Sequence, residues 1–286
     1  MLPPASNYDI IEKTFPNGKN ALLYEEKTPY QLVRLFQNNK DYWLSLNGEL
    51  QFHTEECYFS HKFMCQTALR LLKRNPEEVL IIGGGDGLPT RELLKHVATV
   101  TQIELDHRLI HLTRTHPIMR MLSGDSFNND RVKLVAGDGL GFLINSPKKY
   151  DLIIDDCDFD VSDQPDKKNM NTKYSEYQKC LINKLKPGGI AVVMEPIFWT
   201  WREKSWLKEA SIPRGTKAWL TGLRQWRAGP GGRSFPIEQR KSWIEDRKNE
   251  GLNYWKNVAP YIKSYILDLP VIGPELYIFM SDQPIS

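Results

Sequence analysis

Short apolar runs of strand length alternate with helical segments through the middle of the chain, and this alternation most constrains the fold. The strand-like runs cover residues 79–82, 100–103, 132–135, 152–154 and 189–194, and the helical segments cover 91–96, 107–115 and 175–186. Parallel strands need crossover connections, which are usually helices, so the pattern predicts an α/β fold with a parallel sheet covered on both faces. Runs at 261–267 and 276–280 are expected to form an antiparallel pair at its edge, giving seven strands.

The first part of the chain has a different pattern. Short alternating runs lie at 21–24, 31–36 and 42–46. Turn residues separate them, and Asn47-Gly48 is a dipeptide typical of tight hairpins. We therefore expect a small antiparallel β domain over residues 1–59, then a helix over 60–73 that opens a larger domain over 60–286.

Composition limits the functional classes. A chain of 286 residues with 41% hydrophobic and 26% charged residues is typical of a soluble globular protein. No run approaches the roughly 18 apolar residues of a membrane helix, and the first residues lack the layout of a secretory signal, so a cytoplasmic location without a membrane partner is expected. A net charge of +3 makes a nucleic-acid partner unlikely. The four cysteines form no C-x-x-C pair, so neither a zinc site nor a disulfide framework is expected.

The segment at about 199–258 is distinct from the rest of the chain. It holds 13 Lys and Arg against 6 Asp and Glu, and seven of the eight tryptophans. We interpret it as an insertion whose tryptophans pack on the parent domain, because burial dominates the behaviour of aromatic side chains. A lid over the site, an oligomer contact, or a surface that stacks on nucleobases or pairs with acidic partners are the functional alternatives.

A glycine-rich turn, Gly83-Gly84-Gly85-Asp86-Gly87, directly follows the first strand of the larger domain. Such a turn lets a ligand approach the backbone closely, although it can also serve packing alone. A dinucleotide fingerprint would require a third glycine where Leu88 stands, and Asp86 would repel a pyrophosphate. The turn therefore disfavours an NAD enzyme.

Carboxylates follow the next two strands. Glu104 comes about twenty residues after the glycines, where a carboxylate can accept both hydroxyls of a ribose. Asp138, between Gly137 and Gly139, can accept the exocyclic amine of an adenine. A single acidic residue at a strand end is more often a helix cap, but together these positions indicate a nucleoside pocket without phosphates. That pattern favours S-adenosyl compounds.

The fourth strand ends in a dense acidic run. It comprises Asp155, Asp156, Asp158, Asp160, Asp163 and Asp166. Mutual repulsion raises the pKa values of such carboxylates, and their concentrated negative charge attracts cations. A polyamine suits this negative field. A divalent metal site or a solvated acidic loop are the alternatives. His107 and His111 are spaced for a metal but have no carboxylate in a known arrangement, so no metal site is predicted there.

These motifs together give the chain a family resemblance. They are Tyr24-Glu25-Glu26-Lys27-Thr28-Pro29-Tyr30-Gln31, Leu46-Asn47-Gly48 with Gln51, the glycine turn, Glu104-Leu105-Asp106, Asp130-Arg131-Val132, Gly137-Asp138-Gly139, Tyr150-Asp151-Leu152-Ile153-Ile154, Asp156-Cys157, Thr172-Lys173 with Tyr177, and Leu185-Lys186-Pro187-Gly188-Gly189. In order and spacing the chain resembles the spermidine/spermine synthase family of polyamine aminopropyltransferases, outside the tryptophan-rich segment. The resemblance implies a Rossmann-like sheet of the S-adenosylmethionine-methyltransferase type.

The resemblance also implies substrates and roles. The donor would be decarboxylated S-adenosylmethionine, with no separate cofactor, and the acceptor putrescine or a related amine; a homodimer is also expected. The donor-binding positions would be Gln31, Gly83, Gly85, Glu104, Asp138 and Gly139. His61 and Asp86 would contact amines, and Asp86 would select the decarboxylated donor by repelling the carboxylate of the intact one. Asp156 falls at the position of the general base.

The chain departs from the family pattern on the acceptor side. Ser60 and Lys62 flank His61 where the family usually has tyrosine and often glutamate, and Phe159 replaces a second aspartate. Asp158 or Asp160 is expected to substitute for it in binding amines. The acceptor therefore stays open, as do two other functions for the same scaffold: an amine N-methyltransferase and a non-catalytic paralogue.

Overall fold

The computed structural model describes residues 21–38, 40–47, 49–54, 57–157, 167–196, 245–246, 248–249, 251–253, 255–269 and 273–285. These residues divide into two compact units, with one boundary between Tyr58 and Phe59. Each unit contains its own sheet, a four-stranded one in the first and a seven-stranded one in the second. The predicted α/β class with a small antiparallel sheet ahead of a larger one is confirmed.

The smaller unit is a meander of four antiparallel strands. They are β1 (Ala21–Lys27), β2 (Leu32–Asn38), β3 (Asp41–Leu46) and β4 (Glu49–His53), in that spatial order. Val33 and Leu35 are buried on one face of the sheet with Leu44, the cross-strand partner of Leu35. Phe36 and its partner Trp43 are buried on the other face. Asn47 adopts a left-handed φ of 52° in the turn after β3, and its side chain accepts a hydrogen bond of 2.9 Å from Leu32 N, which ties this turn to the start of β2. The sequence patterns did not predict β4.

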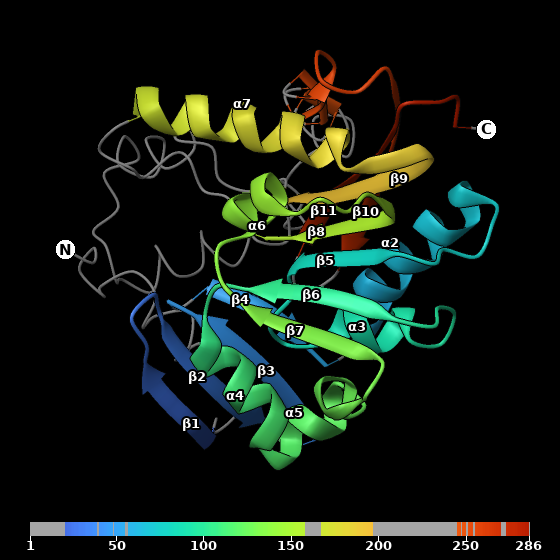
Figure 1. Cartoon of the computed structure of the whole chain (residues 1–286). Coiled ribbons are helices and arrows are strands. Elements are labelled where there is room, and N and C mark those ends of the chain that lie inside the picture. The colour runs from blue at the N-terminus through green and yellow to red at the C-terminus, as the bar shows by residue number, and fades with distance from the viewer. Residues whose placement is uncertain are drawn as a thin grey trace, which may run out of the picture. The chain divides into compact units, whose positions relative to one another are not determined.

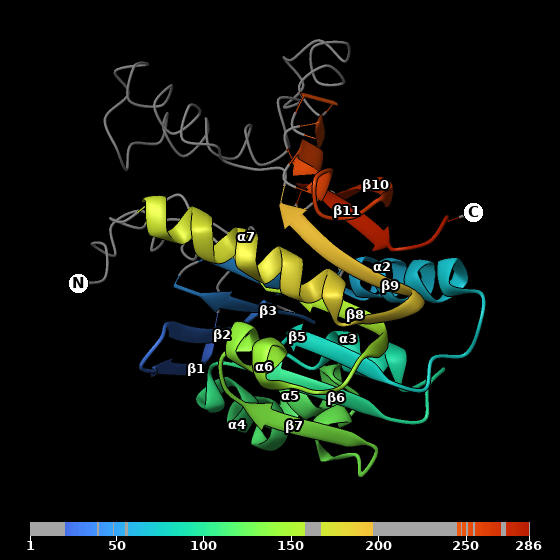
Figure 2. The ribbon, with the colours of Figure 1, turned by 45° about the horizontal axis from the view of Figure 1, so that its top comes forward.

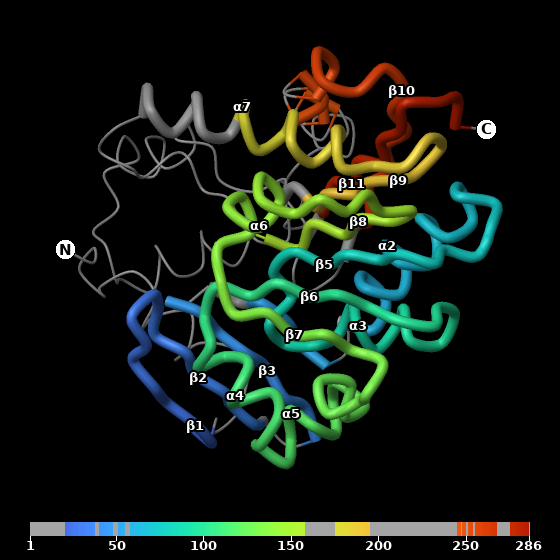
Figure 3. The backbone as a smooth tube through the Cα atoms, in the orientation of Figure 1, coloured from blue at the N-terminus to red at the C-terminus, as the bar shows by residue number. Residues whose placement is uncertain are grey.

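The larger unit alternates strands and helices, and Figure 3 traces its backbone from one to the next. Its helices are α2 (Cys57–Leu72), α3 (Leu88–Leu93), α4 (His107–Thr115), α5 (Pro117–Leu122), η2 (Ser126–Asn128), α6 (Gly139–Asn145) and α7 (Lys167–Asn183). Its strands are β5 (Val79–Gly83), β6 (Val100–Glu104), β7 (Val132–Ala136), β8 (Tyr150–Asp156), β9 (Leu185–Pro196), β10 (Tyr261–Leu269) and β11 (Gly273–Ser281).

The strand order of the large sheet is β10-β11-β9-β8-β5-β6-β7 (Figure 1). Neighbours from β9 to β7 are parallel, whereas β11 runs antiparallel to β9. The predicted seven strands, with the last two at one edge, are therefore confirmed. The chain adds β6 and β7 on one side of β5 and then β8 and β9 on the other, so the strand order reverses between β5 and β8. A ligand is expected at the carboxyl ends of the strands at such a point.

Apolar packing covers both faces of this sheet. On one face, Met64 and Ala68 of α2 pack in a buried cluster with Val79 and Ile81 of β5. Ile82 points to the other face, where it lies against Gly139 at the start of α6; Figure 2 shows α2 and α6 on opposite sides. The burial of consecutive residues along β5 explains why its sequence reads as a continuous apolar run rather than an alternating one.

Several predicted element bounds were wrong. The helix expected at 91–96 is α3, which begins at Leu88 because Pro89 suits the first turn of a helix. The helix expected at 175–186 is α7, which begins at Lys167 and gives way to β9 at Leu185. Helices α5 and α6 were not predicted. By contrast, the helix predicted over 107–115 is confirmed as α4.

Little of the insertion at about 199–258 falls within the described residues. Of its seven tryptophans only Trp255 is described, and it is buried. A Cβ added at the nearby Gly251 would lie 2.8 Å from Leu276 of β11, so this end of the segment packs closely on that strand. None of the helices described in the chain combines the length and the apolar character needed to cross a membrane.

Candidate active site

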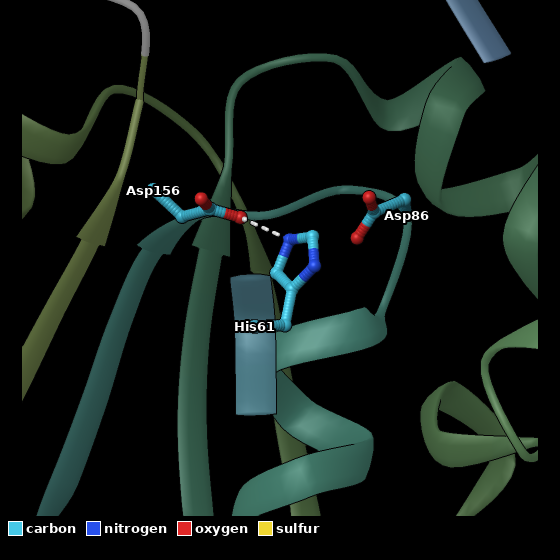
Figure 4. Close-up of side chains that lie close together, drawn as sticks. All are labelled: His61, Asp86 and Asp156. Carbon is cyan, nitrogen blue, oxygen red and sulfur yellow. Dashed lines mark ion pairs between the residues drawn. The ribbon is translucent and has the colours of Figure 1, made fainter. Parts of the chain in front are cut away.

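Three ionisable side chains meet at the carboxyl edge of the large sheet. His61 comes from α2, Asp86 from the turn after β5 and Asp156 from the last position of β8. Figure 4 shows the imidazole between the two carboxylates. His61 Nε2 lies 3.6 Å from Asp156 Oδ2. One ring nitrogen of His61 and one carboxylate oxygen each of Asp86 and Asp156 all lie within 4.8 Å of one another. Such a grouping can surround a single cation, either an ammonium group or a metal ion.

The glycine turn allows the Asp156 backbone and side chain to approach β5. Gly83 and Gly84 have left-handed φ angles of 77° and 64°, a conformation that favours glycine. A Cβ on Gly83 would lie 2.4 Å from the Asp156 carbonyl oxygen, and one on Gly84 would lie 3.1 Å from Asp156 Oδ2. Gly84 N also donates a hydrogen bond of 3.2 Å to that carbonyl. Side chains at these positions would displace Asp156.

Glu104 and Gly85 are in contact beside this cluster. Glu104 ends β6, and its Oε1 accepts a hydrogen bond of 2.7 Å from Asp106 N. A Cβ on Gly85 would lie 2.8 Å from Glu104 Oε2 and 2.5 Å from a methyl carbon of Leu109. The absence of a side chain at Gly85 therefore makes room for the carboxylate at the predicted ribose position.

Burial makes Asp86 and Glu104 reluctant to ionise. Burial raises the pKa of Asp86, as does the nearby charge of Asp156, while His61 opposes the shift. Burial likewise raises the pKa of Glu104 to about 7, with further contributions from Asp106, Asp86 and Asp156. A cationic ligand would relieve this repulsion, because an opposite charge favours the ionised form.

Asp138 acts as a helix cap in this structure. Its side chain accepts a hydrogen bond of 2.8 Å from Gly141 N at the start of α6, as Asp residues commonly do at helix starts. The carboxylate is nevertheless exposed. A Cβ on Gly139 would lie 2.5 Å from Ile82, so close packing of α6 on β5 accounts for that glycine. The roles of both residues in donor binding stay predictions.

The remaining predicted positions are placed as follows. Gln31 precedes β2 in the smaller unit, where its backbone N donates a hydrogen bond of 3.0 Å to Thr28 Oγ1. Asp155 is buried, and its carboxylate accepts a hydrogen bond of 3.3 Å from Cys157 N. Lys62 is exposed, unlike its neighbour His61. Asp158 and Asp160 lie outside the described residues.

Sequence reasoning missed three side chains that donate hydrogen bonds to the backbone carbonyl oxygens of the glycine turn. Gln102 Nε2 donates to the carbonyl oxygens of Gly83 at 2.8 Å and Gly84 at 2.7 Å. Thr113 Oγ1 donates to Gly85 O at 2.6 Å, and Ser126 Oγ donates to Gly87 O at 3.0 Å. The one available signal was Gln102 itself, since a fully buried amide inside an apolar strand requires partners.

Comparison with known proteins identifies the family. The family model described as the spermine/spermidine synthase domain matches residues 58–214, which is more than half of the chain. The chain belongs to this family. The matched range includes His61, Asp86, Glu104 and Asp156, the residues that converge at the sheet edge.

Curated members of the family cover part of the chain. A polyamine aminopropyltransferase 2 of Aquifex aeolicus is 33% identical over 172 residues, which is 60% of this chain and 34% of that protein. A polyamine aminopropyltransferase 2 of Pseudomonas aeruginosa is 33% identical over 176 residues, which is 60% of this chain and 48% of that protein. The chain therefore spans about a third to a half of the length of these relatives.

Solved structures share the fold over nearly the whole chain. A spermidine synthase from Thermotoga maritima superimposes with a TM-score of 0.64 at 20% identity, covering 93% of this chain and 73% of that one. A spermidine synthase in complex with the transition state analogue AdoDATO gives a TM-score of 0.65 at 20% identity, covering 93% and 74%. These similarities establish the fold of this spermine/spermidine synthase domain.

Proposed function

We propose that the protein is a polyamine aminopropyltransferase, which transfers the aminopropyl group of decarboxylated S-adenosylmethionine to putrescine or a related amine. The observation that carries this proposal is the convergence of His61, Asp86 and Asp156 at the carboxyl edge of the sheet, beside the buried Glu104. A cluster of carboxylates suits a donor and an acceptor that are both cations. The family membership and the names of the curated relatives support the same reaction class.

The reaction requires a neutral amine and a proton acceptor. The acceptor ammonium gives a proton to Asp156, and the freed lone pair attacks the aminopropyl carbon next to the sulfonium sulfur. The C–S bond breaks as the C–N bond forms, its electrons stay on sulfur, and a neutral thioether leaves. Asp156 holds its carboxylate beside His61 and the glycine turn, where it faces the other amine-binding groups.

The donor would lie across the glycine turn. We assign the ribose hydroxyls to Glu104 and the adenine amine to Asp138, with Gln31, Gly83, Gly85 and Gly139 as further donor positions, and assign the terminal amine of the donor to Asp86. Decarboxylation leaves that amine without a neighbouring carboxylate, so Asp86 would attract the decarboxylated donor and repel the intact one. No separate cofactor is needed for this chemistry.

The test is mass spectrometry of the products formed from decarboxylated donor and a mixture of diamines and polyamines. We expect an aminopropylated amine, and at least a hundredfold slower formation with Asp156→Asn at unchanged donor affinity, about the contribution of a general base. Asp125→Asn, which changes an exposed carboxylate paired with Arg120, is the matched control. Methyl transfer from intact S-adenosylmethionine instead would make the protein an N-methyltransferase, and donor binding without turnover would make it a non-catalytic paralogue.

The setting of the enzyme is also a proposal. We infer a cytoplasmic enzyme that acts on small molecules, with neither a membrane nor a nucleic-acid partner, and that forms a homodimer as the family resemblance implies. The small net charge of +3 supports the absence of a nucleic-acid partner. Size-exclusion chromatography with light scattering would test the dimer directly.

A further inference from the structure

A line of buried polar side chains connects β11 to Asp156 through the start of α2. The Tyr277 hydroxyl donates a hydrogen bond to the Glu275 carboxylate and is also hydrogen-bonded to Ser60. Ser60 Oγ lies 3.4 Å from His61 Nδ1, and His61 Nε2 lies 3.6 Å from Asp156 Oδ2. Glu275, Tyr277, Ser60 and His61 are each no more than 7% exposed. All five residues belong to the larger unit, so the line lies within one compact body.

The donors and acceptors along this line give it a direction. An ionised carboxylate can only accept hydrogen bonds, so Tyr277 uses its single proton on Glu275. Burial and the charge of Glu275 raise the pKa of the Tyr277 hydroxyl well above its usual value, so this hydroxyl stays protonated. The Tyr277 oxygen then accepts from the Ser60 hydroxyl, and the Ser60 oxygen accepts from His61 Nδ1. In this arrangement Nδ1 donates to Ser60, and in the neutral ring this contact competes with that of Nε2 and the Asp156 carboxylate for the single proton, because the partners of its two nitrogens decide the tautomer of a histidine.

We propose that Glu275, Tyr277 and Ser60 are positioning residues that hold a proton on His61 Nδ1, so that Nε2 is the nitrogen that exchanges a proton with Asp156. This role rests on the proposed aminopropyl transfer. The proton that Asp156 takes from the acceptor ammonium passes on to His61 Nε2 and later to solvent. The amine lone pair forms the C–N bond, and the electrons of the broken C–S bond stay on sulfur.

The surroundings of His61 suit this relay. The imidazolium formed when Nε2 takes the proton has the carboxylates of Asp86 and Asp156 on its two sides (Figure 4), and opposite charges stabilise it. The distance of 3.6 Å from Nε2 to Asp156 is long for a hydrogen bond, as catalytic contacts often are before substrates bind. Asp156 also faces Tyr277 from β8, close enough to raise its pKa.

The proposal also explains a departure from the family pattern. The family resemblance places a tyrosine before His61, whereas this chain has Ser60. The small Ser60 side chain reaches the Tyr277 hydroxyl, which arrives from β11. The phenol hydroxyl therefore comes here from β11 and is linked to the histidine through Ser60, instead of being supplied by the residue before His61 on α2.

Tyr277 also has a packing role, which the experiment must separate from its hydroxyl. Its ring packs edge-to-face against Phe63 with 5.3 Å between centroids. Tyr277→Phe keeps this ring and removes only the hydroxyl. Tyr265→Phe is the matched control, because Tyr265 of β10 packs edge-to-face on the same Phe63 at 5.9 Å and loses the same atom.

The direct test is nitrogen NMR of the full chain labelled with ¹⁵N-histidine, which reports which ring nitrogen carries a proton. The His61 signals are assigned by their loss in His61→Gln. As the pH is raised, we expect His61 to lose the Nε2 proton and keep the Nδ1 proton. Tyr277→Phe and Ser60→Ala should mix the two tautomers, whereas Tyr265→Phe should match the parent. A parent His61 that keeps Nε2–H, or a Tyr277→Phe spectrum identical to the parent, overturns the proposal.

An activity measurement distinguishes this proposal from the proposed function. Tyr277→Phe and Glu275→Gln should lower kcat for aminopropyl transfer about tenfold and shift the pH at which kcat rises, with little change in KM for the donor. If Tyr277→Phe does not unfold cooperatively, Ser60→Ala takes its place. The expected tautomer in a protein without aminopropyl transfer would overturn the proposed function, and the relay with it, and would leave only the tautomer assignment. Normal transfer by all three variants would overturn the relay and leave the proposed function intact.

Discussion

At the scale of single residues, Glu104 should link binding of the proposed donor to pH. Its pKa of about 7 results from burial and from repulsion by Asp106, Asp86 and Asp156. A dicationic donor favours the ionised carboxylate, so binding below this pKa must release a proton. The apparent affinity for decarboxylated S-adenosylmethionine should therefore rise with pH up to about 7 and then level off.

Calorimetry in buffers of different ionisation enthalpy measures this proton release. We expect close to one proton released at about pH 6 and almost none at about pH 8.5. Glu104→Gln should abolish the difference between buffers, since an amide does not titrate. Buffer-independent heats at both pH values would contradict this assignment.

The raised pKa of Glu104 affects the stability of the ligand-free protein in the opposite direction. Because the folded state holds this proton more tightly than the unfolded state, the free energy of unfolding falls as the pH rises from about 4.3, the ordinary glutamate value, to about 7.

At the scale of elements, the predictable part of the fold was the order of buried strands. Apolar runs such as 79–82 require burial on both faces, and only a covered parallel sheet satisfies several of them in succession. Helix α6 escaped prediction because it is short and its cap, Asp138, was interpreted as a ligand. The contact between Gln102 and the glycine carbonyls depends on the pairing of β6 with β5, which places Gln102 opposite Ile81. Local sequence patterns carry no information about that register.

Asp151 joins three segments of the larger unit, and its replacement should destabilise the fold. The side chain is fully buried. It accepts hydrogen bonds from Glu78 N at 2.9 Å and Glu77 N at 3.1 Å, pairs with Lys186 Nζ at 2.9 Å, and also pairs with Arg74. Burial alone raises the pKa of Asp151, but these partners outweigh it and lower the pKa to about 2. The carboxylate thus ties β8 to β9 and to the connection before β5.

Urea unfolding of Asp151→Asn measures the contribution of this group. We expect a loss of roughly 2 kcal/mol, typical of hydrogen bonds to a charged group. Asp125→Asn should leave the free energy of unfolding nearly unchanged, because its ion pair with Arg120 is exposed. A lowered pKa means that this stabilisation is complete above about pH 4 and lost as the pH falls toward about 2. Equal losses in the two variants would show that burial of the carboxylate is irrelevant.

At the scale of the whole molecule, the site depends on segments that are distant in the sequence. His61, Asp86, Glu104 and Asp156 were predicted as site residues from strand ends and family motifs, and the fold brings them to one edge of the sheet. Glu275 and Tyr277 were not predicted, because the contact of Tyr277 with Ser60 depends on how β11 pairs with β9. A run such as 276–280 indicates a strand but not its neighbour.

Donor selection should be visible in the stability of the whole chain, because a ligand that binds only the folded state raises the free energy of unfolding. Decarboxylated S-adenosylmethionine at about one hundred times its Kd should add roughly 2.7 kcal/mol. Intact S-adenosylmethionine at the same concentration should add much less, since its carboxylate would face the buried Asp86. The shifts in Tm caused by the two donors, measured side by side, report how well the protein discriminates between them without any turnover.

Asp86→Asn isolates the charge that we propose makes this choice between donors. The amide oxygen of asparagine can still accept the hydrogen bond of 2.9 Å that Leu88 N donates to Asp86 Oδ1, so the turn should keep its shape. We expect the variant to bind the decarboxylated donor more weakly and to narrow the difference between the two thermal shifts. An uncharged thioether nucleoside serves as the control, because its shift should be equal in parent and variant. If the variant preserves the full difference between the two donors, selection must come from shape or from another charge, since the carboxylate of Asp86 would then contribute nothing to it.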